Sequence, residues 1–151
     1  MRGMIEPTHV FFALALACLM RFPKIPAVIG GIIPDIDIVM NHGFPFVHRG
    51  IVHTGLFMII SVAAIYAVSR RLGPETGVAF GFGLGFLSHL FLDTINPSGI
   101  MWLYPLTPVY FTLNLAPYND VIANTGIMLL SLFSIYVWNV KWRSLDEPGH
   151  A

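Results

Sequence analysis

Seven histidine and aspartate side chains have the types and spacing to bind a divalent metal ion. They are His9, Asp35, Asp37, His48, His53, His89 and Asp93. His89 and Asp93 are four residues apart, so on a helix both project from one face and can share an ion. Asp35 and Asp37 would diverge by roughly 200° on a regular helix of ~3.6 residues per turn. A helix break at Pro34 would let both point the same way.

The mixture of imidazole and carboxylate groups favours Zn²⁺, with Mn²⁺ or Fe²⁺ as alternatives, over Ca²⁺. No thiolate accompanies them, which argues against a closed structural zinc site; the single cysteine, Cys18, is expected to be a buried small hydrophobe. Seven ligands exceed one tetrahedral shell, so we expect two ions, or one ion with surrounding partners. A proton relay or a hydrogen-bonded network is the alternative for the same residues. Arg49 is the nearest cation, and it could bind a phosphate or pair with an aspartate or a lipid headgroup.

Composition identifies the kind of protein that must position these residues. Of 151 residues, 56% are hydrophobic and 11% are charged, whereas soluble domains carry roughly 25% charged residues. The formal net charge is zero and the basic residues are scattered, which gives no indication of nucleic-acid binding. We therefore predict an all-α integral membrane bundle of four to five helices, with one domain over 1–143 and a polar tail over 144–151.

Five apolar segments would form this bundle. Segments 50–69, 76–95 and 120–140 are long enough to cross a bilayer, which takes ~20 apolar residues. Segments 8–20 and 25–40 are shorter, and Gly30-Gly31 and Pro34 interrupt the second, which we expect to be broken or re-entrant. Residues 10–20 are not expected to be a cleaved signal, because Glu6 and His9 stand where a basic region should be.

The basic residues predict the orientation of the bundle. If all five segments cross, six basic residues share one side, and only Arg2 and Arg49 lie opposite. The six are Arg21, Lys24, Arg70, Arg71, Lys141 and Arg143. Positive charge marks the cytoplasmic side, so the C-terminus would be cytoplasmic. All seven candidate ligands map to the non-cytoplasmic end, where charged groups in a bilayer need a partner or an ion.

Details within the segments refine this picture. Gly77, Gly81 and Gly85 form a small-residue stripe that would let another helix approach closely and hold His89 and Asp93 rigidly. The loop 96–119 is rich in aromatic residues, which indicates an interfacial belt or a partial lid.

Three smaller points concern single residues. We place His48 in a turn and His53 in the first turn of the next helix. Asp120 is expected to cap the last helix. His42 is a spare candidate ligand, and His150 lies on the opposite side.

Four short motifs in order resemble a known family. They are Thr8-His9, Gly31 to Asp37 (GIIPDID), His48 to Thr54 (HRGIVHT) and His89 to Asp93 (HLFLD). Together they resemble the LexA-regulated (YdjM-like) membrane-bound metal-dependent hydrolases, whose pieces read approximately TH, G-x-x-x-PD-x-D, HRG-x-x-HS and H-x-x-x-D. Gly99 and Pro105 fit the Gly and Pro that follow, and Thr54 stands where Ser is usual. The resemblance covers roughly 8–108.

The resemblance implies an activity. The family is distantly similar to zinc-dependent phospholipase C, which implies hydrolysis of a phosphoester or lipid-like ester, although fold does not fix function. Asp37 would be a bridging ligand or general base, and Arg49 would steady developing negative charge. The other six candidates would bind one or two ions, and membrane lipid is the expected partner. The alternatives are a non-catalytic protein stabilised by metal and a metal or proton transporter.

Overall fold

The fold is described from a computed structural model of the chain, which covers residues 6–37, 49–73, 77–117 and 119–141. Its elements are α1 (Glu6–Met20), α2 (Lys24–Ile32), the 3-10 turns η1 (Ile33–Asp35) and η2 (Ile51–His53), α4 (Gly55–Leu72), α5 (Gly77–Ile95) and α6 (Val121–Lys141). The prediction of an all-helical bundle is confirmed. Within these described ranges, three helices, α4, α5 and α6, are long and apolar enough to cross a membrane.

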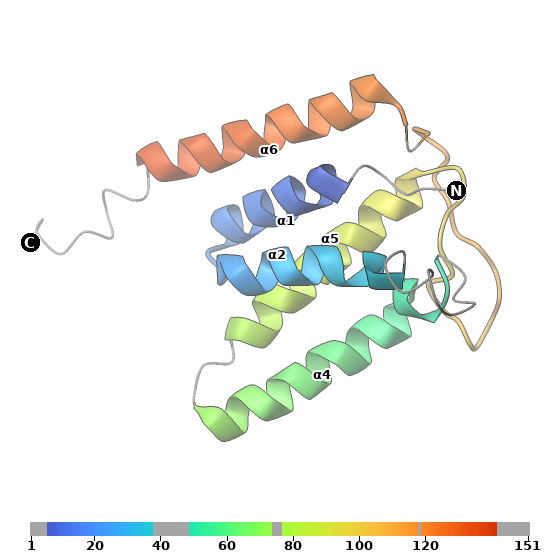
Figure 1. The fold of residues 1–151 in the computed structure, drawn as a ribbon, viewed down its shortest axis with the longest axis horizontal. Helices are drawn as coiled ribbons and strands as arrows, with labels where there is room; N and C mark the ends of the chain where they lie inside the picture. Colours follow the sequence, from blue (N-terminus) through green and yellow to red (C-terminus); the bar gives the residue numbers. More distant parts are fainter. Residues whose placement is uncertain (1–5, 38–48, 74–76, 118, 142–151) are drawn as a thin grey trace, which may run out of the picture.

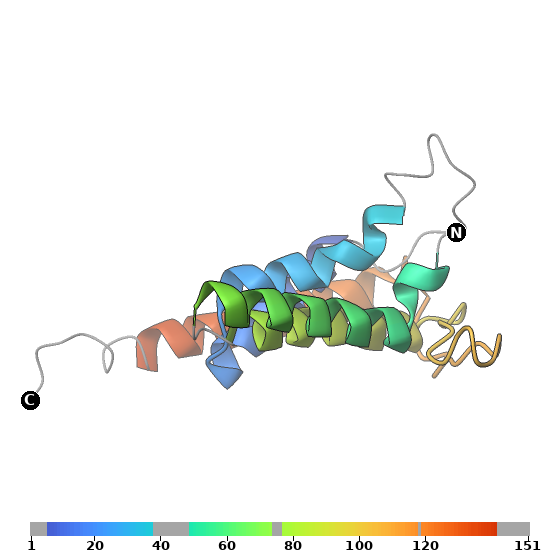
Figure 2. The same ribbon diagram turned by 90° about the horizontal axis from the view of Figure 1, so that it is seen from below.

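The helices run back and forth between two ends of the molecule (Figures 1 and 2). Helix α5 is central and packs against α1, α2 and α4, while α6 packs on α1. The connection from α1 to α2, the end of α4 and the end of α6 lie at one end in Figure 1, and η1, η2 and the last turn of α5 lie at the other. Because successive helices alternate in direction, residues that are far apart in the sequence lie at the same end of the bundle.

The second helix is broken where the sequence predicts. Helix α2 has nine residues, and the chain continues through Pro34 in the 3-10 turn η1. Nine residues at 1.5 Å each reach only ~14 Å, about half of the ~30 Å hydrocarbon core. Because a proline removes one N–H and crowds the preceding turn, the regular helix ends just before it.

Close contact between α2 and α5 depends on glycine. A Cβ at Gly85 would lie 1.8 Å from the Ala27 carbonyl oxygen, and one at Gly30 would lie 2.1 Å from the Phe82 carbonyl oxygen. A Cβ at Gly81 would likewise lie 2.8 Å from the carbonyl oxygen of Pro23, the residue just before α2. The predicted small-residue stripe is thus a packing face, and its backbone approaches α2 as in other membrane helix pairs.

The start of α4 differs from the expectation for His53. This residue lies in η2, not in the first turn of α4, because Thr54 adopts an extended backbone and separates the two elements. The Thr54 hydroxyl accepts a hydrogen bond from the Phe57 N–H at 3.1 Å and caps α4. Asp120 similarly accepts from the Ala123 N–H at 3.0 Å, as expected for the start of α6.

Candidate metal centre

Six of the seven predicted ligands meet at one end of the bundle. We call His9, Asp35, Asp37, His53, His89 and Asp93 the histidine–aspartate cluster. They come from α1, η1, the residues just after η1, η2 and the last two turns of α5. Five are buried, and Asp35 is intermediate. His48 and the spare candidate His42 lie outside the described residues, as does His150.

Four ligand atoms form the centre of the cluster. His53 Nε2 lies 3.5 Å from Asp35 Oδ1 and 3.5 Å from Asp93 Oδ2. His89 Nε2 lies 3.6 Å and 3.5 Å from the same two oxygens. These separations exceed the ~2.7–3.2 Å of a good hydrogen bond. Two ligands ~2.0–2.1 Å from a tetrahedral zinc would lie about 3.3–3.4 Å apart, so each of these four nitrogen–oxygen pairs has nearly the separation of two ligands on one ion.

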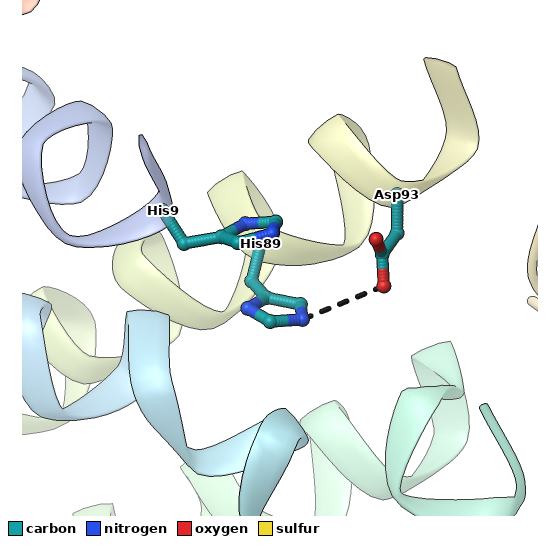
Figure 3. Close-up of side chains that lie close together, drawn as sticks. All are labelled: His9, His89 and Asp93. Atoms are coloured by element: carbon teal, nitrogen blue, oxygen red, sulfur yellow. Dashed lines mark ion pairs between the residues drawn. The ribbon is translucent and has the colours of Figure 1, made fainter. Parts of the chain in front are cut away.

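His9 joins this centre from the neighbouring helix (Figure 3). Its ring stacks on His89 with 3.9 Å between ring centroids, and the residue is 1% exposed. Neither ring nitrogen of His9 has a hydrogen-bond partner within the described part of the chain. A buried polar atom without a partner costs about 1–3 kcal/mol. The position is therefore unfavourable for an imidazole unless a nitrogen binds something else.

Backbone and carboxylate groups fix the orientation of two histidine rings. His89 Nδ1 lies 2.8 Å from the Gly31 carbonyl oxygen, which can only accept a hydrogen bond, so this nitrogen carries the proton and Nε2 remains available. His53 Nδ1 lies 3.3 Å from Asp37 Oδ2, on the side of the ring away from the central atoms. Metal-binding histidines commonly donate the second ring N–H to a carbonyl or carboxylate in this way.

Arg49 pairs with an aspartate, which is one of the alternatives that the sequence left open. Its Nη2 lies 2.9 Å from Asp93 Oδ1, and its Nη1 donates to the Gly99 carbonyl oxygen at 3.1 Å. Its backbone N–H donates to Asp37 Oδ2 at 3.2 Å. The backbone of Arg49 has a φ of 65°, in the left-handed region, which is uncommon for a residue with a side chain. Arg49 is thus held against Asp93 of the centre and Asp37 beside it.

Asn96 borders the centre but was not among the site residues predicted from the sequence. Its Oδ1 accepts from the Ser98 N–H at 2.9 Å and lies 3.5 Å from Arg49 Nη1. Asn-Pro-Ser-Gly at 96–99 is a turn signal in the sequence, but periodicity gives no sign that this turn would border Arg49. The loop after α5 therefore supports the centre, through Gly99 and Asn96, in addition to presenting its aromatic residues.

Asp35 and His53 lie outside the spanning helices, and the charges of the cluster shift the pKa values of both. Burial alone would raise the pKa of the Asp35 carboxyl, but His53, then His89 and His9, outweigh it and lower the pKa. Burial alone would lower the pKa of His53, but the carboxylates of Asp35 and Asp37, with Asp93, raise it to about 9. Without a metal ion, Asp35 is therefore ionised and His53 protonated near neutral pH.

The donor set fits a divalent ion. The described residues contain two overlapping groups, His9 with His89 and Asp93, and Asp35 with His53 and His89, in which one ligand atom per residue lies within 4.8 Å of the others. The unpartnered nitrogens of His9 and the 3.5 to 3.6 Å separations of the central atoms are what an ion would satisfy. Imidazole and carboxylate ligands suit zinc, manganese or iron.

Comparisons with known proteins agree with a membrane location. The sequence model of a family described as "YdjM inner membrane protein" matches residues 4–146. The chain is 27% identical over 126 residues to "Uncharacterized protein YvsG" of Bacillus subtilis (strain 168), which covers 72% of this chain and 75% of that protein. No solved structure matches the chain.

Proposed function

The chain belongs to the YdjM family of inner membrane proteins, and on that premise we propose that it is a membrane-embedded, metal-dependent hydrolase of a phosphoester or lipid-like ester. The carrying observation is His9, whose two ring nitrogens are buried without a hydrogen-bond partner beside four convergent ligand atoms. A metal-dependent hydrolase of membrane lipids would need such a ligand set close to the membrane surface.

In this proposal the candidate ligands are assigned to a first ion or to a second one. His53 Nε2, His89 Nε2, Asp35 Oδ1 and Asp93 Oδ2 would hold the first ion, most suitably zinc. His9 would complete that shell or, with His48 from outside the described residues, contribute to a second one. When bound, such an ion lowers the pKa of a coordinated water toward ~7 and polarises a phosphoryl or carbonyl oxygen.

The remaining polar residues would position these ligands. One oxygen of Asp37, Oδ2, lies near His53 and also accepts a hydrogen bond from the Arg49 N–H. We therefore assign Asp37 first as a positioning residue, with bridging ligand and general base as the alternative roles. Arg49 fixes Asp93 through Oδ1 and leaves Oδ2 directed to the two histidines. A direct contact of Arg49 with an anionic substrate would require an exchange of these partners.

Substrate would reach the site at the side of Asp35. This side chain is 11% exposed, whereas those of His53, His89 and Asp93 are fully buried. The centre lies at the end opposite the basic residues of α4 and α6, which supports a location at the non-cytoplasmic face with a cytoplasmic C-terminus. A site at that depth favours ester groups of membrane lipids as substrates.

The distribution of buried polar groups bears on the alternative functions. A transporter needs polar groups along the bundle. Among the described residues, the buried positions toward the basic end are small or apolar, such as Ala17, Ala27 and Ala79, with Ser131 the polar exception in α6. A non-catalytic metal-stabilised protein is the stronger alternative, and a coordination shell without an exchangeable water would favour it.

Metal content and hydrolysis together test the proposal. The detergent-purified protein and its Asp93→Asn variant would be measured for metal per chain by elemental mass spectrometry. Both would then be assayed with bis(4-nitrophenyl) phosphate and with phospholipid vesicles. We expect one or two equivalents of metal and a hydrolytic rate that falls at least ~100-fold with metal removal or in the variant. Bound metal with no hydrolysis of either substrate would indicate the non-catalytic alternative, and no metal uptake would refute both.

A further inference from the structure

A groove of about 650 Å³ lies between α4 and α5, away from the metal centre. Its walls are apolar side chains of both helices, together with Phe22 from the connection between α1 and α2. Ala63 and Gly83 are the small residues of this lining, and α5 approaches α4 closely at Gly83, where a Cβ would lie 3.0 Å from Val62. Both helices are long and apolar enough to cross a membrane, so the groove would face the hydrocarbon chains of the bilayer.

The groove and the metal centre use opposite faces of α5. Leu87 lines the groove and precedes His89 by two residues, which rotates it by about 200° on a helix. Phe80, Gly83 and Leu84 share the face of Leu87. An occupant of this groove is therefore distinct from a substrate in the metal centre, and the inference does not depend on the proposed function.

One end of the groove carries aromatic rings and positive charge. The ring centroids of Phe22 and Tyr66 lie 6.5 Å and 6.3 Å from that of Phe80. Arg70 follows Tyr66 by four residues and therefore extends the same face of α4. Arg21 precedes Phe22, and both arginines are exposed. Aromatic rings followed by basic side chains are typical of the boundary between hydrocarbon and headgroups.

We propose that this groove binds an acyl chain of an anionic phospholipid, with the headgroup phosphate at Arg70. Arg21 adds to the positive potential at that mouth, where an acidic headgroup gains about 1 kcal/mol per nearby basic residue. The groove extends along α5 from Ala79 to Leu87, which are eight helical rises or ~12 Å apart. A slender acyl chain fits.

Native mass spectrometry of the full chain tests this site. Delipidated protein in detergent would be titrated with dioleoyl phosphatidylglycerol or dioleoyl phosphatidylcholine. We expect one phosphatidylglycerol retained per chain in preference to phosphatidylcholine. Ala63→Trp fills the groove and should remove this lipid, whereas Ala64→Trp, on a neighbouring exposed position outside the lining, should retain it.

A second pair of variants tests the headgroup contact. Arg70→Gln should weaken phosphatidylglycerol binding about fivefold, which corresponds to one basic residue near an anionic lipid. Arg71→Gln removes the same charge about 100° away on the helix and should have a smaller effect. Equal losses in both pairs, or no retained lipid, would overturn the proposal. A dimer that disappears in Ala63→Trp would assign the groove to a second chain instead. Metal content, measured in parallel, should not change in any of the four variants.

Discussion

His9 is a polar side chain that lies in a buried position at the edge of the metal centre. It is almost fully buried, its ring stacks on His89, and its two nitrogens have no hydrogen-bond partner among the described residues. In other buried histidines of the cluster, one nitrogen faces a carbonyl or a carboxylate. A ligand role explains why a polar ring is kept at a position where an apolar side chain would pack without penalty.

Replacing His9 by leucine should separate folding from metal binding. In metal-free protein, His9→Leu removes two unsatisfied atoms and should leave the melting temperature unchanged or raise it. In the wild type, zinc at ~100 times its Kd should add about 2.7 kcal/mol to the free energy of unfolding. The variant should lose most of that increment. Thermal unfolding in detergent with and without chelator measures both effects; an unchanged zinc increment would exclude His9 as a ligand.

The raised pKa of His53 predicts how metal binding depends on pH. Protonated His53 contributes stability below its ordinary pKa of 6.5, and this contribution is lost as pH rises through about 9. A metal ligand must be neutral, so binding displaces this proton. Apparent zinc affinity should therefore rise from pH 6.5 to about 9, by roughly tenfold per pH unit for one displaced proton.

Titration with a zinc buffer at several pH values would measure this slope. Asp37→Asn provides the comparison, because Asp37 is one of the groups that raise the pKa of His53. Its slope should flatten at a lower pH than in the wild type. A wild-type affinity that does not vary with pH would contradict the assignment of His53 as a ligand.

At the scale of elements, the contact between α2 and α5 sets the geometry of the centre. It places Gly31, at the end of α2, next to His89 and brings η1 with Asp35 over the last turns of α5. The contact exists because Gly85 and Gly30 have no side chains to separate the two backbones. Short as it is, α2 is therefore held by packing more than by its own length.

A side chain at Gly85 should disturb both the fold and the centre. Gly85→Leu would place a Cβ 1.8 Å from the Ala27 oxygen, so α2 must move and carry Gly31 and Asp35 with it. We expect loss of metal and destabilisation of several kcal/mol, as for overpacked cores. Gly126→Leu, in α6 with nothing within 4 Å of its Cβ, should retain metal. Metal content and thermal unfolding of the two variants give the comparison.

At the scale of the whole molecule, alternating helices place two kinds of charge at opposite ends. The histidine–aspartate cluster lies at the end where α5 finishes, and the basic residues Arg70, Arg71 and Lys141 lie where α4 and α6 finish. In a bilayer, this separation predicts an orientation with the metal centre on the non-cytoplasmic side, because positive charge is retained on the cytoplasmic side.

Labelling of single cysteines in cells should reveal that orientation. In a Cys18→Ser background, Leu106→Cys lies in the loop after α5 and Leu72→Cys lies at the end of α4; both leucines are 85% exposed. A membrane-impermeant maleimide applied outside the membrane should label the cysteine at 106 and not the one at 72. After the membrane is permeabilised, both should react. The reverse pattern would place the metal centre on the cytoplasmic side.

The helical segments, the break at Pro34 and the gathering of the candidate ligands at one end could all be predicted from the amino-acid sequence. Apolar run length, proline chemistry and the i,i+4 spacing of His89 and Asp93 are local properties, so they can be read along the chain. The packing role of Gly81 and Gly85 was predictable for the same reason. The three-dimensional structure was needed to show that Arg49 pairs with Asp93, that Asp37 lies beside His53 and that Asn96 lies beside Arg49. Those contacts join separate elements, and periodicity within one element does not determine which side chains of two elements meet.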